Sequence, residues 1–353
     1  LNDSPMVASE PTETLPKRRL GRTEHCSSLV AFGAIALAPL ALEESRREVL
    51  TAFEWGVNHF DVAPSYADAE SKLGPALEGI RDKVFLACKT LERSREGARR
   101  ELENSLRLLR TDHFDLYQFH SVDALEDLDA ILGPQGALQA VLEAREAGEV
   151  RFIGITGHFA PVQAQALRHF AFDTLMVPVD LVDRFYFGAE NGLLALAHQL
   201  DVGVIAIKST FRGAVADKVS AYRYTLSLPV STTIPAGNVE EIQLAIEIAK
   251  QLQPMTAEEM AVLLRDSPEL GNKVCRQCQY CLPCPAGVDI PLIFALEGFG
   301  ARYRRAQAGE MYRSLPLNMT ACTDCGECNK RCPYGLAVVQ DLRRAHQFLS
   351  GAA

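Results

Sequence analysis

The chain has 353 residues, of which 48% are hydrophobic and 23% charged, and it carries a formal net charge of −9 at pH 7. This balance is ordinary for a folded globular protein, while the negative charge argues against binding to nucleic acid, which demands a basic face. No apolar run approaches the roughly 18 residues that a membrane helix needs, so the composition also argues against a membrane protein.

The N-terminal residues 1–16 are small, polar and interrupted by proline, which is typical of a disordered tail. The apolar stretch from Ser28 to Leu42 contains Pro39, is too short to span a membrane and lacks the basic start of a secretory signal peptide. The sequence therefore predicts a cytoplasmic protein whose cysteines stay reduced.

Short runs rich in apolar and β-branched residues recur at regular intervals along most of the chain, which is the pattern of buried strands. We predict eight strands, at Ser28–Gly33, Val57–Val62, Val84–Lys89, Phe114–His120, Phe152–Thr156, Leu175–Asp180, Val202–Lys208 and Ser231–Ile234. Between them lie amphipathic stretches such as EESRREVLTAFEWG and EGARRELENSLRLLR, whose apolar positions recur every three to four residues, as in helices.

The alternation of strand and helix, repeated eight times, predicts an α/β fold in which residues 17–250 form a closed (β/α)8 TIM barrel. An open, doubly wound sheet is the competing architecture. Such a sheet usually carries a Gly-x-Gly-x-x-Gly turn after its first strand, whereas the turn after Gly33 reads AIALAP. The sequence therefore favours the barrel.

Ionisable side chains stand at the ends of three neighbouring predicted strands. Asp61 ends the second strand and Tyr66 lies in the turn after it, while Lys89 ends the third strand and His120 the fourth. Each of them alone has an ordinary interpretation, such as a turn aspartate or a satisfied core histidine. Because active sites of (β/α)8 barrels lie at the C-terminal strand ends, we expect the four together to surround one pocket.

The barrel is followed by a predicted helical linker, residues 251–270, and by a cysteine-rich module, residues 271–353. In the linker, Pro254 breaks the pattern and TAEEMAVLLRD restarts it as a helix, with Thr256 as its N-cap. The module carries eight of the ten cysteines, and between its two cysteine runs the segment LIFALEGFGARYRRAQ predicts one long helix. Cys26 and Cys88 lie in apolar surroundings and are expected to be buried.

The two cysteine runs have an unusually tight spacing. They read Cys275-x2-Cys278-x2-Cys281-x2-Cys284-Pro and Cys322-x2-Cys325-x2-Cys328-x3-Cys332-Pro. Thiolates at every third position can surround a compact inorganic core, and the closing Cys-Pro is the signature of bacterial ferredoxins. The runs therefore predict two [4Fe-4S] clusters in a ferredoxin-like domain. In two-cluster ferredoxins the last cysteine of each run crosses to the other cluster, which would place Cys332 with the first run and Cys284 with the second.

Zinc and disulfides are the alternative uses of these cysteines. Structural zinc sites usually take two Cys-x2-Cys pairs with a sizeable gap between the pairs, whereas here four cysteines crowd into one short loop, twice. Disulfide-rich scaffolds are secreted and spread their cysteines along the chain. Both alternatives are less favoured than iron–sulfur clusters.

Three segments of the barrel, GVNHFDVAPSYADAESKLG, FLACKT and FDLYQFH, resemble the signature series of the aldo-keto reductases. The resemblance covers the barrel nearly end to end. The tail, with CPAGVDIPLIF, resembles the branch of that family with a C-terminal ferredoxin-type domain. The resemblance implies a catalytic tetrad of Asp61, Tyr66, Lys89 and His120, a nicotinamide cofactor, NADP(H) or NAD(H), and a small carbonyl or alcohol substrate.

The tetrad has a physical rationale for carbonyl reduction. A hydride added to a carbonyl carbon leaves negative charge on the oxygen, and Tyr66 would donate a proton there. We expect the charge of Lys89 to lower the tyrosine pKa from its ordinary value of about 10. Asp61 would keep Lys89 charged and oriented, and His120 would hydrogen-bond the carbonyl oxygen.

The resemblance also implies where the cofactor binds, and here the chain departs from the family. The Ser-Asn pair that grips the carboxamide after the fifth strand is replaced by Thr156-Gly157, which keeps a hydroxyl and loses the amide, with His158 as a candidate replacement. After the seventh strand, Lys208 and Arg212 are candidates for the pyrophosphate.

The loop after the eighth strand determines the expected choice between the two nicotinamide cofactors. The family carries basic residues there for the 2′-phosphate of NADP. Here Gly237 and the following helix start could favour an anion through backbone N–H groups, but Glu240 and Glu241 lie nearby and no Lys or Arg precedes Lys250. The sequence therefore favours NAD, or a weakened site, over a strong NADP preference.

Two functions of different class follow from these motifs. The first is an enzyme that reduces an aldehyde or ketone, or oxidises the alcohol, with the clusters serving structure or electron transfer. Hydride transfer moves two electrons together, whereas each cluster moves one. The alternative is therefore a non-catalytic redox-sensing or electron-transfer subunit that passes single electrons to a redox protein partner.

Overall fold

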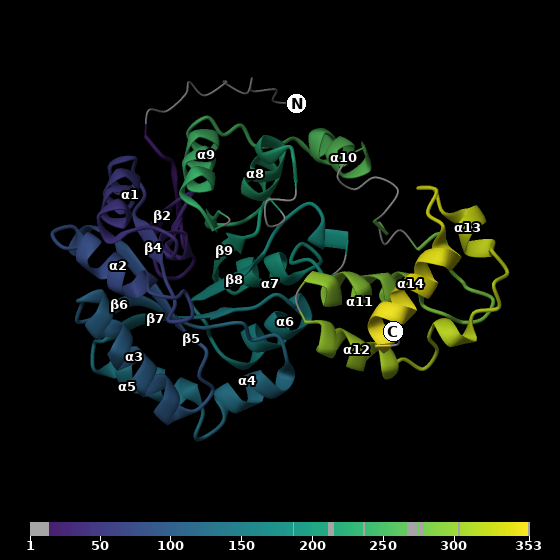
Figure 1. Ribbon diagram of the computed structural model, residues 1–353, viewed down its shortest axis with the longest axis horizontal. Helices are drawn as coiled ribbons and strands as arrows, with labels where there is room; N and C mark the ends of the chain where they lie inside the picture. The colour runs from purple at the N-terminus through teal and green to yellow at the C-terminus, as the bar shows by residue number, and fades with distance from the viewer. Residues whose placement is uncertain are drawn as a thin grey trace, which may run out of the picture. The chain divides into compact units, whose positions relative to one another are not determined.

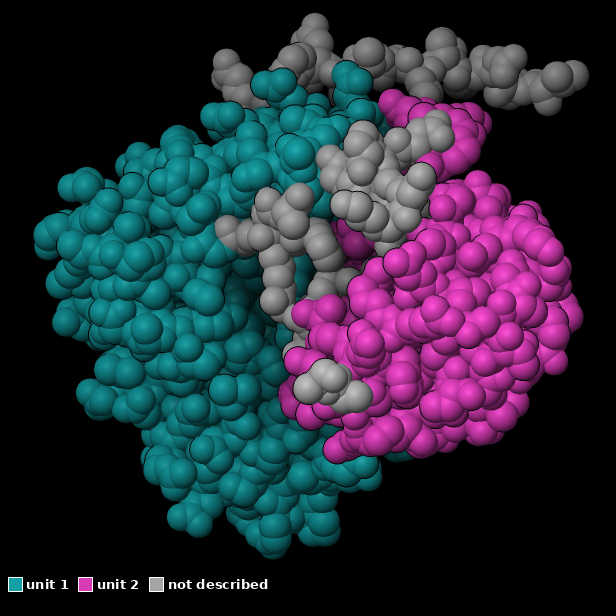
Figure 2. All heavy atoms as spheres, turned by 45° about the vertical axis from the view of Figure 1, so that its right-hand side comes forward, with its two compact units in different colours: residues 1–179, 192–255 teal, residues 180–191, 256–353 magenta. Residues whose placement is uncertain are grey.

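The computed structural model describes residues 14–185, 187–210, 215–235, 237–266, 274–275, 279–302 and 304–351. The chain forms two compact units, coloured separately in Figure 2. The first contains residues 1–179 and 192–255, and the second contains residues 180–191 and 256–353.

The first unit is built around eight parallel strands, each hydrogen-bonded to the next in chain order (Figure 1). They are β3 (Phe32–Gly33), β4 (His59–Asp61), β5 (Phe85–Thr90), β6 (Phe114–Phe119), β7 (Val150–Thr156), β8 (Thr174–Pro178), β9 (Gly203–Ile207) and β10 (Thr232–Ile234). A parallel bridge between Val30 and Thr233 joins the first strand region to the last. The sheet therefore closes, which confirms the predicted (β/α)8 barrel.

Helices connect the strands and cover the outside of the barrel (Figure 1). They are α1 (Leu42–Glu54), α2 (Ala69–Ala76), α3 (Arg95–Leu109), α4 (Leu125–Leu132), α5 (Ala137–Glu146), α6 (Ala160–His169), α7 (Leu193–Gln199), α8 (Lys218–Ser227) and α9 (Val239–Lys250). Polar side chains cap the N-termini of several of these helices. Ser94 accepts a hydrogen bond from Gly97 N, and Asn238 accepts one from Glu241 N. Such N-caps satisfy amides that have no partner within the helix.

An antiparallel hairpin of β1 (Lys17–Arg19) and β2 (Cys26–Ser28) precedes the barrel and was not predicted. It sends Leu20, which is fully buried, into a core cluster with Ala31, Phe85 and Ile205. Gly21, at φ +51°, allows the close approach, because a Cβ there would lie 2.1 Å from Gly203 N. The hairpin therefore packs tightly against the N-terminal end of β9.

The hairpin corrects two sequence predictions. The run predicted as one strand from Ser28 to Gly33 is divided between β2, the Val30 bridge and β3. Cys26, expected to be buried, is exposed, whereas Cys88 is buried as predicted. Ser27 turns inward and its Oγ lies 2.7 Å from His59 Nδ1, whereas Cys26, at the first position of β2, is exposed.

The second unit is mostly helical. It contains the short helices η3 (Asp183–Phe185) and η4 (Met319–Ala321), and α10 (Ala257–Asp266), α11 (Ile290–Arg302), α12 (Arg305–Arg313), α13 (Glu327–Arg331) and α14 (Val338–Ser350). Thr256 Oγ1 accepts from Glu259 N at 3.1 Å, so the predicted N-cap of α10 is confirmed. Among the residues that the structure describes, no helix is long and apolar enough to cross a membrane.

The single long helix expected between the cysteine runs is in fact two, α11 and α12. Gly300 allows the two helices to approach closely, because a Cβ there would lie 2.8 Å from Ala308 Cβ. The chain thus turns back on itself after α11. Tyr312 Oη, near the end of α12, then meets His346 Nδ1 of α14 at 2.7 Å.

Candidate active site and cluster ligands

The four residues predicted at the strand ends come together. The ammonium group of Lys89, on β5, donates to the carboxylate of Asp61, on β4, and to Tyr66 Oη at 3.2 Å. The ring of Tyr66 lies edge-on to that of His120, with centroids 5.9 Å apart and an interplanar angle of 87°. The backbone register explains this convergence, since neighbouring parallel strands bring their C-terminal ends to the same edge of the barrel.

Lys89 and Asp61 form a buried ion pair, with exposed fractions of 0% and 2%. Burial alone would lower the pKa of Lys89, but the Asp61 carboxylate and the Tyr66 oxygen outweigh it and the pKa is raised. Lys89 therefore stays charged at neutral pH. Gln118 Nε2 donates to Asp61 Oδ2 at 3.0 Å and fixes the carboxylate from its other side.

The phenol of Tyr66 departs from the sequence expectation. Burial raises the pKa of Tyr66, and the charge of Lys89 lowers it by less than burial raises it. The net shift is upward, whereas the sequence argument considered the lysine alone. At neutral pH Tyr66 is consequently a protonated phenol, which is the form that can donate a proton.

His120 is a neutral ring next to this phenol. Burial, together with the charge of Lys89, lowers the pKa of His120 to about 3. Within the described part of the chain, its Nδ1 atom is buried without a hydrogen-bond partner. Arg93 Nη2 donates to the backbone carbonyls of His120 at 3.0 Å and of Ser121 at 3.2 Å, and so anchors the segment that carries the ring.

The candidates at the end of β7 are partly buried and contact neighbouring loop residues. Thr156 is 3% exposed and its Oγ1 accepts from Ser121 N at 2.9 Å, which leaves its own O–H as a donor. A Cβ at Gly157 would lie 2.1 Å from Gln163 Nε2, so no side chain fits there. The ring of His158 meets Asp123 Oδ2 through Nδ1 at 3.0 Å.

The candidates near β9 and β10 offer a place for an anion. Gly237 precedes the twelve-residue helix α9, and a Cβ at this position would meet no atom within 4 Å. Open backbone before a helix start suits a phosphate group, because the first N–H groups point outward there. Lys208 follows β9 directly, with φ +61°. Arg212 lies outside the described residues.

Two acidic residues add negative charge at the same helix start. They are Glu240 and Glu241, in the first turn of α9. Glu241 is 4% exposed, accepts from Tyr222 Oη at 3.0 Å and pairs with Lys218. Lys218 is thus engaged by a carboxylate, and its charge is compensated within the protein.

Sequence reasoning missed three residues that hold the site together, namely Gln118, Arg93 and Asp123. Gln118 could have been found, because it lies two positions before His120 and alternate residues of a strand share a face. Arg93 and Asp123 bind across loops that are distant in sequence, and no local pattern indicates such contacts.

The cysteines of the second unit line two cavities. One is bordered by Cys275, Cys281 and Cys332, and the other by Cys284, Cys322, Cys325, Cys328 and also Cys281. Each cavity thus receives cysteines from both runs, as the crossed ligand pattern requires. Cys278 lies outside the described residues. Arg331 Nη1 donates to Pro283 O at 3.1 Å and ties the two runs together.

The donor set fits iron–sulfur clusters. The second cavity has only thiolates as metal-binding groups in its wall, with the apolar Val288, Ile290 and Leu342 around them. A cubane is a multi-atom core that thiolate ligands surround.

Comparison with family models assigns both parts of the chain. A model described as the aldo/keto reductase family matches residues 29–263, and one described as a 4Fe-4S dicluster domain matches residues 274–337. The first match covers well over half of the chain.

Two curated proteins illustrate the similarity. The chain is 30% identical over 187 residues to aldo-keto reductase YhdN of Bacillus subtilis, covering 49% of this chain and 54% of the relative. It is 32% identical over 155 residues to L-galactose dehydrogenase of Arabidopsis thaliana, covering 40% of this chain and 48% of the relative. The chain therefore spans about half the length of these curated relatives.

Solved structures share the barrel fold. Aldo-keto reductase AKR11C1 from Bacillus halodurans, in its holo form, matches with a TM-score of 0.63 at 23% identity, over 71% of this chain and 96% of that chain. An aldo-keto reductase from Klebsiella pneumoniae in complex with NADPH matches with a TM-score of 0.59 at 22% identity, over 72% and 96%. The predicted resemblance is confirmed: the protein belongs to the aldo/keto reductase family, in a form whose barrel is followed by a 4Fe-4S dicluster domain.

Proposed function

We propose that the barrel is an NAD(P)-dependent oxidoreductase that reduces an aldehyde or ketone, or oxidises the corresponding alcohol, with Tyr66 as the general acid. The observation that carries this proposal is the contact of the buried Lys89 ammonium with Asp61 on one side and Tyr66 Oη on the other. A relative named as a dehydrogenase and a neighbouring structure described with NADPH support the same chemistry.

The residues of the site would divide the work as follows. A bound reduced nicotinamide would supply the hydride for the carbonyl carbon. Tyr66 then gives its phenol proton to the carbonyl oxygen, and Lys89 stabilises the phenolate that remains. Asp61 keeps Lys89 charged and in place. His120, neutral at physiological pH, can donate one ring N–H to the same oxygen and so orient the carbonyl.

We propose that the dinucleotide lies across the strand ends, against Thr156, Gly157, His158, Lys208, Arg212 and Gly237. The carboxamide would meet the Thr156 hydroxyl and the His158 segment, and the pyrophosphate would meet Lys208 and the start of α9. Because Glu240 and Glu241 flank that helix start, we propose NAD, or weakly bound NADP, as the cofactor.

We propose that the two [4Fe-4S] clusters are held by Cys275, Cys278, Cys281 and Cys332, and by Cys322, Cys325, Cys328 and Cys284. In domain terms, residues 1–16 would be a tail, 17–250 the reductase barrel, 251–270 a linker and 271–353 the cluster domain. The barrel and the cluster cysteines both suit the reducing cytoplasm.

The second candidate function is that of an electron-transfer subunit. The observation that favours it is the shared wall of the two cysteine-lined cavities, since Cys281 and Ile290 border both. Clusters bound so near each other could exchange single electrons and pass them to a redox protein partner.

The two functions are separated by a steady-state assay. NADH or NADPH is mixed with the cluster-containing protein and a panel of small aldehydes and ketones, and nicotinamide absorbance is followed. Tyr66→Phe should lower kcat by roughly 10²–10⁴-fold, the range for loss of a general acid. Tyr117→Phe is the matched control, because it removes a buried hydroxyl from the opposite face of β6. No turnover with any carbonyl, together with cluster reduction by a partner, would favour the electron carrier.

A further inference from the structure

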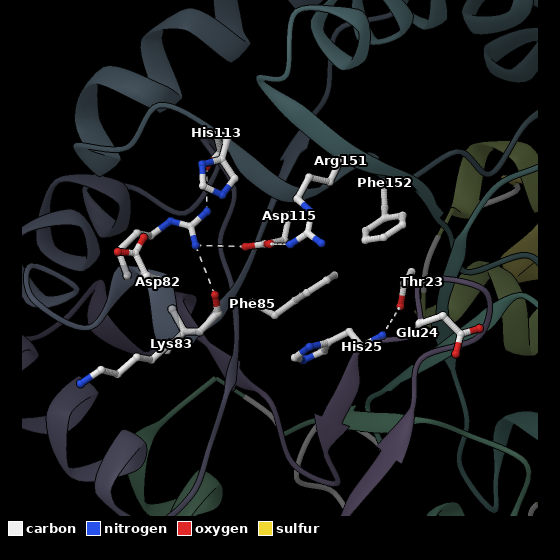
Figure 3. Close-up of a pocket in the computed structure, with 12 residues that line it drawn as sticks. Thr23, Glu24, His25, Asp82, Lys83, Phe85, His113, Asp115, Arg151 and Phe152 are labelled. Atoms are coloured by element: carbon white, nitrogen blue, oxygen red, sulfur yellow. Dashed lines mark hydrogen bonds and ion pairs between the residues drawn. The ribbon is translucent and has the colours of Figure 1, made fainter.

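A polar cavity of about 450 Å³ lies where β5, β6 and β7 begin (Figure 3), at the strand ends away from Tyr66. Its wall includes Thr23 and His25 of the hairpin turn, Arg81 of the short helix η2 (Arg81–Lys83), and Asp115 and Arg151 of the sheet. Residues at this face of a (β/α)8 barrel usually serve stability. A cavity lined by convergent charged groups needs a further explanation.

A charged triad forms one side of this cavity. Asp115, which is 4% exposed, accepts from Arg81 Nη1 at 3.0 Å and from Arg151 Nη1 at 2.8 Å. Arg81 also donates to Thr111 Oγ1, Val84 O and His113 O, so its guanidinium is used in holding the wall. Two guanidinium groups on one carboxylate leave the triad with one net positive charge.

Arg151 is the member of the triad that can bind a ligand. Within the described residues, Arg151 contacts Asp115 through Nη1 and the ring of Phe152, whose centroid lies 5.5 Å from Cζ. Its side chain is 58% exposed. The remaining donors, on Nε and Nη2, form the planar edge that matches the two oxygens of a carboxylate.

Flat rings lie beside the triad in Figure 3. The ring of Phe85 stacks on that of His25, with centroids 4.4 Å apart and an angle of 18°, and on that of Phe152, at 6.4 Å and 22°. Burial lowers the pKa of His25 to about 4, so this wall carries no charge at neutral pH. An aromatic ring can pack favourably against such a surface.

The other charged residues that line the cavity are Glu24, Asp82 and Lys83. In Figure 3 the side chain of Lys83 points away from the triad. The carboxylate of Glu24 accepts from Arg19 Nε at 3.0 Å, and the same guanidinium also donates to Asp201, at 2.7 and 2.8 Å. The charged residues of the whole lining thus sum to zero, and the net positive charge is confined to the triad, beside the uncharged rings.

We propose that this cavity binds a small aromatic carboxylate, with its carboxylate on Arg151 and its ring against the partly exposed rings of Phe152 and His25. One net positive charge matches a monoanion. A phosphate dianion would need more compensating charge than the triad provides. The site is therefore a second binding site, separate from the residues proposed for hydride transfer.

Calorimetric titration of the full-length, cluster-containing protein with benzoate tests the proposal, with inorganic phosphate titrated in parallel. We expect saturable binding of one benzoate per chain, and binding about tenfold weaker, equivalent to about 1.4 kcal/mol, in Arg151→Gln. Arg100→Gln is the control, because Arg100 is an exposed arginine of α3 paired with Glu96. Arg151→Lys keeps the charge without the planar edge and should bind with intermediate affinity.

Benzoate could also occupy the catalytic pocket, so Tyr66→Phe serves as the second control and should leave the titration unchanged. The proposal is overturned by an absence of saturable benzoate binding, by equal binding to Arg151→Gln, by loss of binding in Tyr66→Phe, or by phosphate binding more tightly than benzoate. Circular dichroism of each variant confirms that the fold is retained before affinities are compared.

Discussion

Lys89 Nζ lies 3.2 Å from Tyr66 Oη, although the two residues come from different strand ends and burial disfavours the charge of the lysine. A buried ammonium persists only when its partners repay the lost hydration. The contact therefore couples the stability of the barrel to the proposed proton donor.

Replacing Lys89 by Met should harm both stability and activity. The Asp61 carboxylate would remain buried without its partner, which typically costs about 3–5 kcal/mol of unfolding free energy. Urea denaturation monitored by the fluorescence of Trp55, the single tryptophan of the chain, measures this loss in the barrel. The double variant Lys89→Met/Asp61→Leu removes both charges and should regain part of the stability while staying inactive. A Lys89→Met protein as stable as the wild type would contradict the buried ion pair.

A basic residue at the start of α9 should change the cofactor preference. Glu240 is exposed in the first turn of this helix, so Glu240→Arg would place a positive charge where a 2′-phosphate could reach it. We expect NADPH affinity to rise about tenfold relative to NADH, measured by fluorescence titration. Glu247→Arg, an equally charge-reversing change farther along the helix, should have no such effect. Tight NADPH binding by the wild type, with no NADH binding, would refute the proposed preference.

Removal of one crossed ligand should empty one cluster site only. Cys332 borders the same cavity as Cys275 and Cys281, so Cys332→Ala should reduce the iron content from about eight to about four atoms per chain. Iron analysis and low-temperature electron paramagnetic resonance of the dithionite-reduced protein measure this. Cys26→Ser, at an exposed cysteine of the hairpin, is the control and should retain all the iron. Unchanged iron in Cys332→Ala, or zinc in place of iron, would rule out the assignment.

Mild acid should destabilise the barrel through its buried histidines. Burial lowers the pKa of His59 and His120 to about 3 and that of His25 to about 4. In the unfolded chain these rings titrate near pH 6.5, so between the two values the unfolded state binds more protons. The unfolding free energy should consequently fall as pH drops below about 6.5, by up to about 1.4 kcal/mol per pH unit for each histidine.

Urea midpoints of the barrel at pH 7, 6 and 5 give the slope of this dependence. His59→Asn removes one of the three titrating rings and keeps a polar group near Ser27, whose Oγ lies 2.7 Å from His59 Nδ1. The slope should become shallower in this variant. A barrel whose stability rises between pH 7 and pH 5 would contradict the prediction.

Much of the barrel could be predicted from the sequence because buried parallel strands are nearly continuous apolar runs. The predicted strand Val84–Lys89 corresponds to β5 at Phe85–Thr90, and Val202–Lys208 corresponds to β9 at Gly203–Ile207. The hairpin before the barrel escaped prediction. Its strands have three residues each, and β1 consists of Lys17, Arg18 and Arg19, so its pairing depends on contacts with the barrel rather than on a local pattern.

The site was predictable in its members and less so in its electrostatics. Asp61, Tyr66, Lys89 and His120 could be named because each is polar and ends or follows a strand. The upward shift in the pKa of Tyr66 could not, since it results from burial by residues far apart in the sequence. For the same reason the sequence does not indicate that Gln163 fills the space where a side chain at position 157 would lie. Only the folded chain shows this contact.

The barrel closes through a narrow seam. Val30 and Thr233 form one bridge, with Ala31 N donating to Thr233 O and Thr233 N to Leu29 O, both at 2.9 Å, whereas β8 and β9 pair at five positions. Local opening begins where the fewest backbone bonds must break, so these amides should exchange with deuterium sooner than those between β8 and β9. Gly33 lies beside this seam, and a Cβ there would reach within 2.7 Å of Ile234 Cγ2. A larger residue at position 33 would therefore push β3 and β10 apart and weaken the closure of the barrel.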